Sequence, residues 1–483
     1  MNGSSRRDMM PIEADRMLSA ARSGAASNRM PIVEAVHGVV FWIFVVALAW
    51  APFWFGSNVL LAWGINAIVF PGLVLIFEAA LLCAGGRHPV AWRTVALPFI
   101  CLGAVIVFVM VQNAVWTPRV IHHPIWDMTS SALDQPVAGS ISANRDLTMQ
   151  ALIRLLTAAS AFWLALQLCR NPLHAHRLMM AVAAIAAAYG AYGLIARIAE
   201  PGAGGFVTST FYNRNHFATF AGMGLIVAFG LLLRLYGNVP DKNASWRMRA
   251  AGFLETTGNA GAFHIGITAI IAAALMLTGS RGGIISFLAG VIVLSFLTFS
   301  RHRDSGGEPF AVIGLFGLLV AAVFVVFGDT FFGKVEHLGF ADESRLAVYR
   351  LTVDSIAAAP ILGHGYGTFA DVFPMFRDRS VDVAGIWTAA HNSYLEVFQG
   401  LGLVVGTLLV VAVALPVFRC VVGATTRKAD AAVPAIAAGV SCLIALNALV
   451  DFSLQVQAVT LTFMAILGAG VAQSTSSRTD LRD

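Results

Sequence analysis

Apolar runs of about twenty residues recur along the whole chain, and they constrain its fold more than any other feature. Such a run is as long as a helix needs to be to cross the hydrocarbon core of a membrane. Of the 483 residues, 58% are hydrophobic and only 12% are charged, whereas a soluble domain carries roughly twice that charge. The alternating ten-residue segments of an outer-membrane barrel are absent from the sequence. The sequence therefore predicts an all-α polytopic integral membrane protein.

About twelve spans are expected when the apolar runs are marked one by one. They cover residues 33–51, 58–83, 94–113, 149–169, 178–199, 216–236, 260–278, 283–300, 310–328, 393–418, 433–450 and 456–473. Short cytoplasmic loops carry an excess of basic residues, which orients the spans. With the N-terminus inside, about 20 of the 31 lysines and arginines fall in the tails and short loops on one side.

This orientation predicts the organisation of the chain. We expect a cytoplasmic tail at 1–32, a membrane domain at 33–473 that includes a large outward-facing loop at 329–392, and a cytoplasmic tail at 474–483. Both termini would then lie in the cytoplasm. The five cysteines fall in or beside apolar runs without metal-ligand spacing, so they predict no disulfide framework and no metal site.

Four arginines near the outward ends of the spans are unusual, because basic residues are depleted on that side. Arg154 and Arg197 lie near the outward ends of the fourth and fifth spans, and Arg214 and Arg281 lie on outward-facing loops. One explanation is that the side chains snorkel toward the lipid head groups. The other is an anion-binding site at the outer membrane surface, because the arginine fork binds phosphate oxygens bidentately and keeps its charge.

The sixth span opens with the polar sequence "TSTFYNRNHFATF" (208–220). Asn213 and Asn215 are candidate helix caps, and Arg214 and His216 lie beside them. Unpaired N–H groups and the positive end of the helix dipole favour anions at such a helix start.

The eighth and tenth spans open in the same way. "LTGSRGGIISF" (277–287) surrounds Arg281 with glycines that permit a tight turn and close backbone approach. "AAHNSYLEVF" (389–398) places His391 before a helix start, with Ser393 and Glu396 at the spacing of a capping box. Together, the three openings predict a site for a pyrophosphate attached to a lipid.

Residues 341–360 of the outward loop have the pattern of an amphipathic helix. Its expected apolar stripe comprises Leu346, Tyr349, Val353 and Ile356. Its polar side is expected to carry an Arg350–Asp354 pair at i,i+4. In the following "ILGHGYGTF" (361–369), Gly363 and Gly365 would let the backbone approach a sugar or phosphate; a glycine-rich connection between elements is the alternative.

The segment "SRLAVYRLTVDSIAAAPILGHGYGTFADVF" (344–373), followed by "HNSYLEVFQGLGLVVG" (391–406), resembles the signature of the O-antigen ligase/polymerase superfamily. The segments "FYNRNHFATF", "LTGSRGG" and "VDFSLQVQA" (450–458) are also similar to segments of that family. The resemblance covers roughly residues 205–460. It implies a GT-C-like protein of the bacterial inner membrane whose large loop is periplasmic.

The resemblance also implies an activity and a set of site residues. The enzyme would move a glycan from undecaprenyl pyrophosphate to a hydroxyl of a glycan, lipid-core or protein acceptor. Arg281 and His391 would be catalytic, the first holding the pyrophosphate and the second assisting the acceptor. Further expected substrate-binding residues, some from the motifs and some from the topology alone, are Arg154, Arg197, Asn213, Arg214, Asn215, His216, Arg345, Gly363, Gly365 and Asn392.

The expected mechanism needs no cofactor and no metal, because the donor already carries an activated leaving group. The arginines would neutralise charge on the departing pyrophosphate. His391 would accept the proton of the acceptor hydroxyl, and the nearby arginines and helix N-terminus would favour its neutral form. Alternatively, His391 is an interface residue bonded to the backbone.

Two other functions stay open at this stage. A polymerase would join repeat units with the same donor chemistry. A transporter would instead place ionisable residues near the middle of the membrane. No nucleic-acid partner is expected, and membrane lipids surround the chain.

Overall fold

The computed structural model describes most of the chain as helix. It describes residues 35–199, 205–236, 255, 257–301, 317, 343–381, 386–427 and 431–475. These ranges contain no β-strand, which confirms the predicted all-α class. Both predicted tails (apart from residues 474 and 475), nearly all of the predicted span at 310–328 and the first part of the predicted outward loop lie outside the described residues.

Helices of membrane-crossing size account for the other predicted spans. Eight helical stretches of the described ranges are long and apolar enough to cross a membrane. They are α2 (Leu60–Cys83), η1 with α3 (Trp92–Val95 and Ala96–Asn113), α5 (Arg145–Leu168), α6 (Pro172–Ala199), α7 (Arg214–Tyr236), α10 (Arg281–Arg301), α15 (Ser393–Thr426) and α17 (Gln457–Ser474). Shorter apolar helices are Ala35–Trp50, α9 (Ala262–Leu277) and α16 (Ala432–Asn447). The predicted polytopic membrane protein is thereby confirmed.

Shorter elements lie between these helices. They are η2 (Arg119–Ile121), α4 (Ile125–Leu133), η3 (Thr257–Gly261), α13 (Glu343–Ala358), α14 (Phe369–Val372), η4 (Phe373–Met375) and η5 (Ser453–Gln455). The sequence did not predict α4, which is too short and too polar to resemble a span.

Helix α7 is the centre of the bundle. Its whole apolar window is buried inside the protein, as expected for a helix that is apolar on all sides. It contacts α6, α9, α10, α16 and α17. By contrast, α2 and α3 bury only about a quarter of their windows, at 28% and 22%, so most of their apolar surface faces outward.

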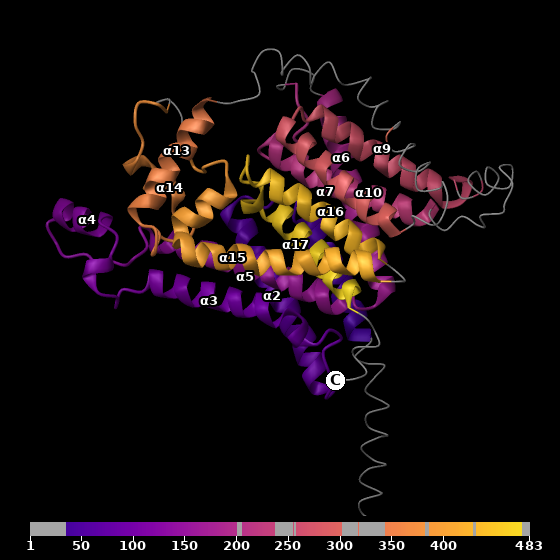
Figure 1. Cartoon of the computed structure of the whole chain (residues 1–483), viewed down its shortest axis with the longest axis horizontal. Helices are drawn as coiled ribbons and strands as arrows, with labels where there is room; N and C mark the ends of the chain where they lie inside the picture. Colours follow the sequence, from indigo (N-terminus) through magenta and orange to yellow (C-terminus); the bar gives the residue numbers. More distant parts are fainter. Residues whose placement is uncertain are drawn as a thin grey trace, which may run out of the picture.

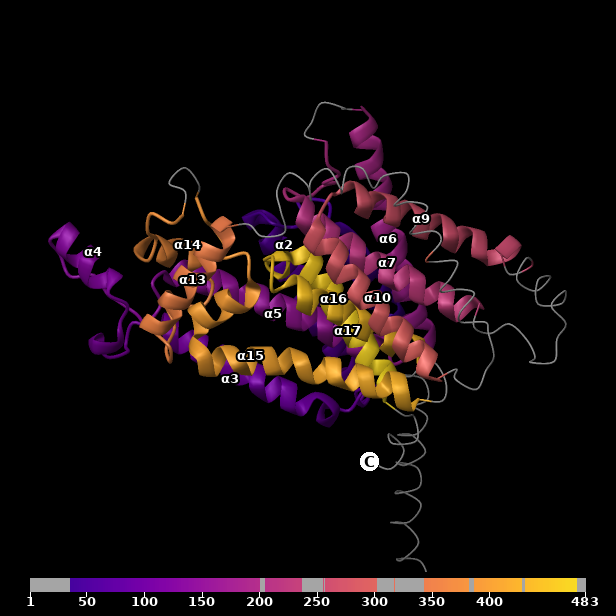
Figure 2. The same cartoon turned by 45° about the horizontal axis from the view of Figure 1, so that its top comes forward.

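The remaining helices flank this centre. Helix α17 contacts α5, α15 and α16, and α15 runs alongside α3 (Figure 1). Helices α13 and α14 lie beyond the first residues of α15, and α4 lies farther out, beyond the end of α3, in both views (Figure 2). One end of the bundle is therefore extended by a small group of short helices.

Helix α13 confirms the helix predicted at 341–360 but buries a different face. Its side chains Val348 and Leu351 pack with Phe369 and Phe373 of α14 and η4. Of the predicted stripe, Ile356 is buried at 9% exposed, whereas Leu346 and Val353 are 56% and 50% exposed. The stripe was therefore wrong in part, because the buried face is set by these short helices, which the sequence pattern does not reveal.

The predicted i,i+4 pair on α13 is also wrong. Arg350 donates instead to Asp378, with an N–O distance of 2.9 Å. A partner from the following loop competes successfully with Asp354, because exposed pairs along one helix are worth only a few tenths of a kcal/mol.

Candidate functional site

Four chain segments meet at the end of the bundle that carries α13. Helices α7 and α10 begin there with Arg214 and Arg281, and α15 begins just after His391. The link between α16 and α17 contributes Asp451. A Cβ atom added to Gly282 would lie 3.1 Å from Val450, so the start of α10 touches this link directly.

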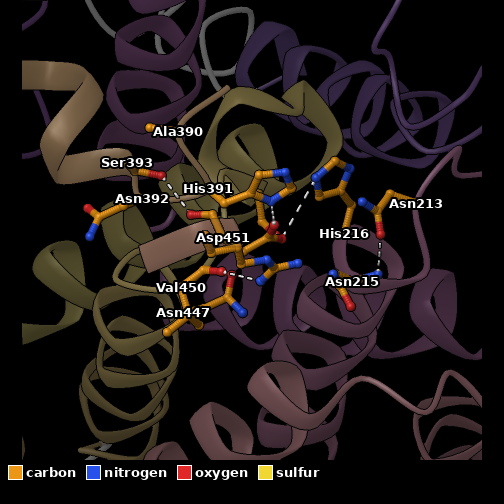
Figure 3. Close-up of polar contacts among 12 residues, drawn as sticks. Asn213, Asn215, His216, Ala390, His391, Asn392, Ser393, Asn447, Val450 and Asp451 are labelled. Atoms are coloured by element: carbon orange, nitrogen blue, oxygen red, sulfur yellow. Dashed lines mark hydrogen bonds and ion pairs between the residues drawn. The ribbon is translucent and has the colours of Figure 1, made fainter. Parts of the chain in front are cut away.

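A buried carboxylate joins two histidines at the centre of this region (Figure 3). Nδ1 of His391 lies 3.4 Å from Oδ1 of Asp451, and Nε2 of His216 lies 3.7 Å from Oδ2. Asp451 is 2% exposed, and Ser453 donates a hydrogen bond of 2.5 Å to Oδ2. Burial alone would raise the pKa of Asp451, but the two histidines and Ser453 outweigh burial and hold that pKa below its usual value.

The turn that carries His391 has an unusual backbone conformation. His391 has φ of 55°, which is uncommon for a residue with a Cβ atom and costs of order 1–3 kcal/mol. Its carbonyl oxygen accepts a hydrogen bond of 2.9 Å from the Tyr349 hydroxyl of α13. The imidazole lies edge-on to Phe452 and Trp387, with ring centroids 4.8 and 5.6 Å apart.

This conformation leaves one imidazole nitrogen for a substrate. The His391 side chain is 20% exposed. Because Nδ1 faces the carboxylate of Asp451, Nε2 on the other side of the ring is the atom that can meet a ligand.

The start of α15 is bound to the link between α16 and α17. The Ser393 N–H donates to the Ala448 carbonyl at 2.8 Å, and its hydroxyl donates to the Asp451 carbonyl at 3.2 Å. The Asn392 side-chain amide donates to the Leu449 carbonyl at 3.0 Å. These bonds fix the backbone around His391 relative to the backbone around Asp451.

The predicted capping box at the start of α15 is wrong. Asn392 is the N-cap, since its side-chain oxygen accepts from the N–H groups of Tyr394 and Leu395. Glu396 is one residue too far along to return to that cap. It accepts instead from the Ala390 N–H at 2.7 Å and from the Gln455 side chain.

Three guanidinium groups gather beside the histidines. Arg345 of α13 donates from Nη1 to the Val450 carbonyl at 3.0 Å. Arg214 lies over the Phe206 ring at 4.2 Å, and its buried Nη1 has no hydrogen-bond partner among the described residues. Arg281 and Arg345 are close enough to repel Arg214 electrostatically. Three helices thus bring like charges together, an arrangement that an anion would stabilise.

The start of α7 is capped as predicted by Asn213. Its side-chain oxygen accepts from the Asn215 N–H at 2.8 Å. Asn215 is not a cap, because it is already the second residue of the helix.

The other two predicted arginines differ in their surroundings. Arg154 of α5 stacks on the Trp63 ring at 4.4 Å and interacts electrostatically with Glu396 and Tyr366. Its buried Nε has no hydrogen-bond partner in the described ranges. Arg197 has a buried Nη1 near the end of α6, and no hydrogen bond or ion pair among the described residues joins it to the histidines. A role for Arg197 at the site stays a prediction.

The glycines of the "ILGHGYGTF" segment pack against the protein's own backbone. Gly363 has φ of 65°, and a Cβ atom there would lie 2.4 Å from the Gly400 carbonyl oxygen. Gly365 has φ of 108°, and a Cβ atom would lie 2.3 Å from the Ser142 hydroxyl. Close helix–loop packing therefore accounts for both glycines, and their contact with substrate stays a prediction.

Sequence reasoning missed Asp451 and Tyr349 as site residues. Asp451 was visible as a single carboxylate at the outward end of an apolar run, within a segment used only for the family resemblance. Tyr349 was assigned to an apolar stripe. Nothing in the local sequence shows that its hydroxyl reaches a carbonyl 42 residues away.

Comparison with known proteins supports the resemblance. Residues 266–411 match the family described as O-antigen ligase. No curated protein matches the chain. The matched range contains Arg281, Arg345 and His391, whereas Arg214 and Asp451 lie outside it. The resemblance to the O-antigen ligase/polymerase superfamily is thus supported over this part of the chain, which is less than half of its length.

Proposed function

We propose that the protein is a glycosyltransferase that moves a glycan from undecaprenyl pyrophosphate to an acceptor hydroxyl, as an O-antigen ligase does. One observation carries the proposal: His391 and its buried partner Asp451 lie at the same end of the bundle as Arg214, Arg281 and Arg345. A proton acceptor and an anion-binding group are the two elements that this transfer needs.

The arginines supply the anion-binding part. As the bond between the sugar and the pyrophosphate breaks, negative charge builds up on the departing phosphate oxygens. Guanidinium groups from α7, α10 and α13 are fixed in advance near that charge, so they stabilise the transition state without reorganising. The substrate-binding role of Arg154, Asn213 and Asn392 is part of the same proposal.

His391 supplies the base. Nε2 accepts the proton of the acceptor hydroxyl while the oxygen forms the new glycosidic bond, and the electron pair of the broken bond leaves with the pyrophosphate. Asp451 is a positioning residue, because its carboxylate lies 3.4 Å from Nδ1 and favours the tautomer with the proton on that nitrogen, which leaves Nε2 without one. It also stabilises the imidazolium that forms. A single displacement inverts the anomeric carbon.

The membrane context follows the proposed chemistry. The site faces the periplasm, the chain lies in the bacterial inner membrane with both termini in the cytoplasm, and the reaction uses neither metal nor cofactor. Acceptor recognition distinguishes a ligase from a polymerase that joins repeat units, and both use the same arginines and base. A transporter is disfavoured, because the histidines and three arginines lie at one rim of the bundle.

The direct test is product analysis with purified protein. Defined lipid-linked glycan is incubated with candidate glycan, lipid-core and protein acceptors, and the products are separated by mass. Transfer that is lost in His391→Ala, with unchanged thermal stability, is the expected result. Full transfer by that folded variant would overturn the assignment of the base.

A further inference from the structure

A hollow lies at the same end of the bundle, formed by three segments far apart in sequence. They are the turn after the helix Ala35–Trp50, the second half of α6, and the residues leading into α7. The cavity has a volume of about 740 Å³ and opens to the surface. Most of its lining side chains are aromatic, and none is charged.

The backbone around the cavity is held in uncommon conformations. Phe55, Ser57 and Ser209 have φ of 52°, 52° and 51°. Among the described residues other than glycine, only two more have positive φ, and one of these is His391. Such conformations are costly and cluster where a protein positions functional groups. The turn at Phe55 is therefore, like the turn at His391, a candidate for a functional role.

Hydrogen bonds hold the three segments together. The Ser209 hydroxyl donates to the Tyr189 carbonyl at 2.7 Å, and the Thr210 hydroxyl donates to the Pro52 carbonyl at 2.5 Å. The rings of Phe55 and Tyr212 stack with centroids 4.2 Å apart and an angle of 10° between their planes. Specific hydrogen bonds and ring stacking therefore fix the wall of the cavity.

The chemistry of the lining discriminates between ligands. A phosphate needs cationic or N–H donors, and no charged side chain lines this cavity. A polyisoprenoid chain would be expected to meet leucine, isoleucine, valine or methionine, and the lining contains none of these. The C–H groups of a sugar ring pack on the electron-rich face of an aromatic ring. Its hydroxyls form hydrogen bonds with polar groups such as the hydroxyl of tyrosine.

Two tyrosines of the lining supply such hydroxyl groups. Tyr192 and Tyr212 are 54% and 63% exposed, and within the described ranges neither hydroxyl is hydrogen-bonded to protein. Isolated aromatic side chains at a membrane interface act as anchors, but these rings surround a hollow.

The position of the cavity connects it to the site already described. Its lining residue Tyr212 directly precedes Asn213, the cap of α7, and Arg214 is the first residue of that helix. The aromatic cavity is therefore adjacent in sequence to Arg214, where an anionic ligand would bind.

We propose that this aromatic cavity is a subsite for uncharged sugar rings of a glycan. The inference rests on the proposed glycosyl transfer and deepens it by assigning a place to the carbohydrate. The rings could belong to the donor or to the acceptor, because both present the same chemistry. Tyr192 and Tyr212 would bind sugar by stacking and by their hydroxyls, without taking part in bond breaking.

The test compares Tyr192→Ala, Tyr212→Ala and the two tyrosine-to-phenylalanine variants with the wild type in detergent or nanodiscs. Equilibrium binding is measured with the lipid-linked glycan, with the acceptor glycan and with undecaprenyl pyrophosphate, which has no sugar. In transfer assays, KM is measured separately for donor and acceptor. Phe418→Ala is the matched control, because this ring is 67% exposed on α15 and does not line the cavity.

The expected result is a loss of about tenfold or more in glycan affinity for the alanine variants, with kcat unchanged. The phenylalanine variants should retain part of the affinity, because they keep the ring. A higher donor KM with weaker binding of the lipid-linked glycan assigns the donor sugar; a higher acceptor KM alone assigns the acceptor. Undecaprenyl pyrophosphate should bind all variants equally.

Two outcomes would overturn the inference, and a third separates it from the proposed function. Equal weakening of undecaprenyl pyrophosphate binding would show that the cavity holds the lipid. If folded variants bind the glycan as the wild type does, with unchanged KM values, the two tyrosines serve only as anchors at the membrane interface. If the wild type transfers nothing, the proposed function fails. Selective loss of binding to the lipid-linked glycan or to the acceptor glycan would still uphold the sugar subsite, and unchanged binding of both would refute it.

Discussion

The carboxylate of Glu396 accepts the N–H of Ala390 at 2.7 Å and also accepts from the side chain of Gln455. Ala390 precedes His391, and Gln455 belongs to the short helix after Asp451. One partly buried side chain at the start of α15 therefore connects the segment with the imidazole to the segment with its carboxylate partner.

Replacing Glu396 with alanine should lower kcat about tenfold while leaving KM for the donor nearly unchanged. The imidazole and Asp451 would lose their common tether, and small displacements of a reacting group are costly in rate. Glu396→Gln keeps one oxygen for Ala390 and should restore part of the rate. Wild-type kcat in a folded Glu396→Ala protein would contradict the tethering role.

Asp451→Asn should lower kcat on the order of 10²-fold or more, because an amide neither fixes the imidazole tautomer nor stabilises the imidazolium. Donor affinity should change little. Asp451→Glu provides a second readout, because it keeps a carboxylate and should restore part of the rate. Equal rates for the two variants would show that the charge at this position does not act on the imidazole.

Arg281→Lys should weaken the binding of undecaprenyl pyrophosphate and lower kcat, although the charge is kept. Lysine cannot reproduce a bidentate contact with phosphate oxygens. The matched control is Arg350→Lys, because Arg350 is exposed and paired with Asp378. Equal kinetics for both variants would mean that only the charge at Arg281 matters.

Thermal stability should decrease as the pH is lowered from about 6.5 toward 4. His123 and His364 are buried and hydrogen-bonded at 3.0 Å, with the outer nitrogens bonded to the Ile125 N–H and the Ser355 carbonyl. Burial, reinforced by His364, lowers the pKa of His123 from 6.5 to about 4. The unfolded chain therefore binds the proton more readily, and acid favours unfolding.

The measurement for this pair is the Tm of the wild type and of His123→Asn between pH 7.5 and 4.5. Asparagine still donates to His364 but takes up no proton, so its Tm should depend less on pH. Parallel curves for the two proteins would exclude the pair as the source of acid sensitivity.

Gly402→Ala should destabilise the protein severely, by more than about 3 kcal/mol. Gly402 has φ of 72° within α15, and an added Cβ atom would lie 2.3 Å from the Ile361 carbonyl oxygen. Gly103→Ala is the control, because a Cβ atom on that α3 residue meets nothing within 4 Å. It should leave the protein as stable or stabilise it slightly. Similar Tm values for the two variants would contradict the close approach.

The membrane helices could be predicted from the sequence because long apolar runs have few alternative structures. The helix starts at Arg214 and Arg281 were also within reach, since caps and glycines mark them locally. The meeting of His391 with Asp451 was not, because it depends on how α15 and α16 pack. The buried face of α13 could not be predicted either, since Phe369 and Phe373 determine it after the chain has turned back.

The apolar window of helix α7 is enclosed by neighbouring helices, so the backbone that carries Arg214 at its start is held by the centre of the bundle. His391 instead sits on a turn secured by separate hydrogen bonds to α13 and to the link after α16. In the proposed reaction, the leaving group would therefore be held from the enclosed centre of the molecule, and the proton acceptor from a turn at its periphery.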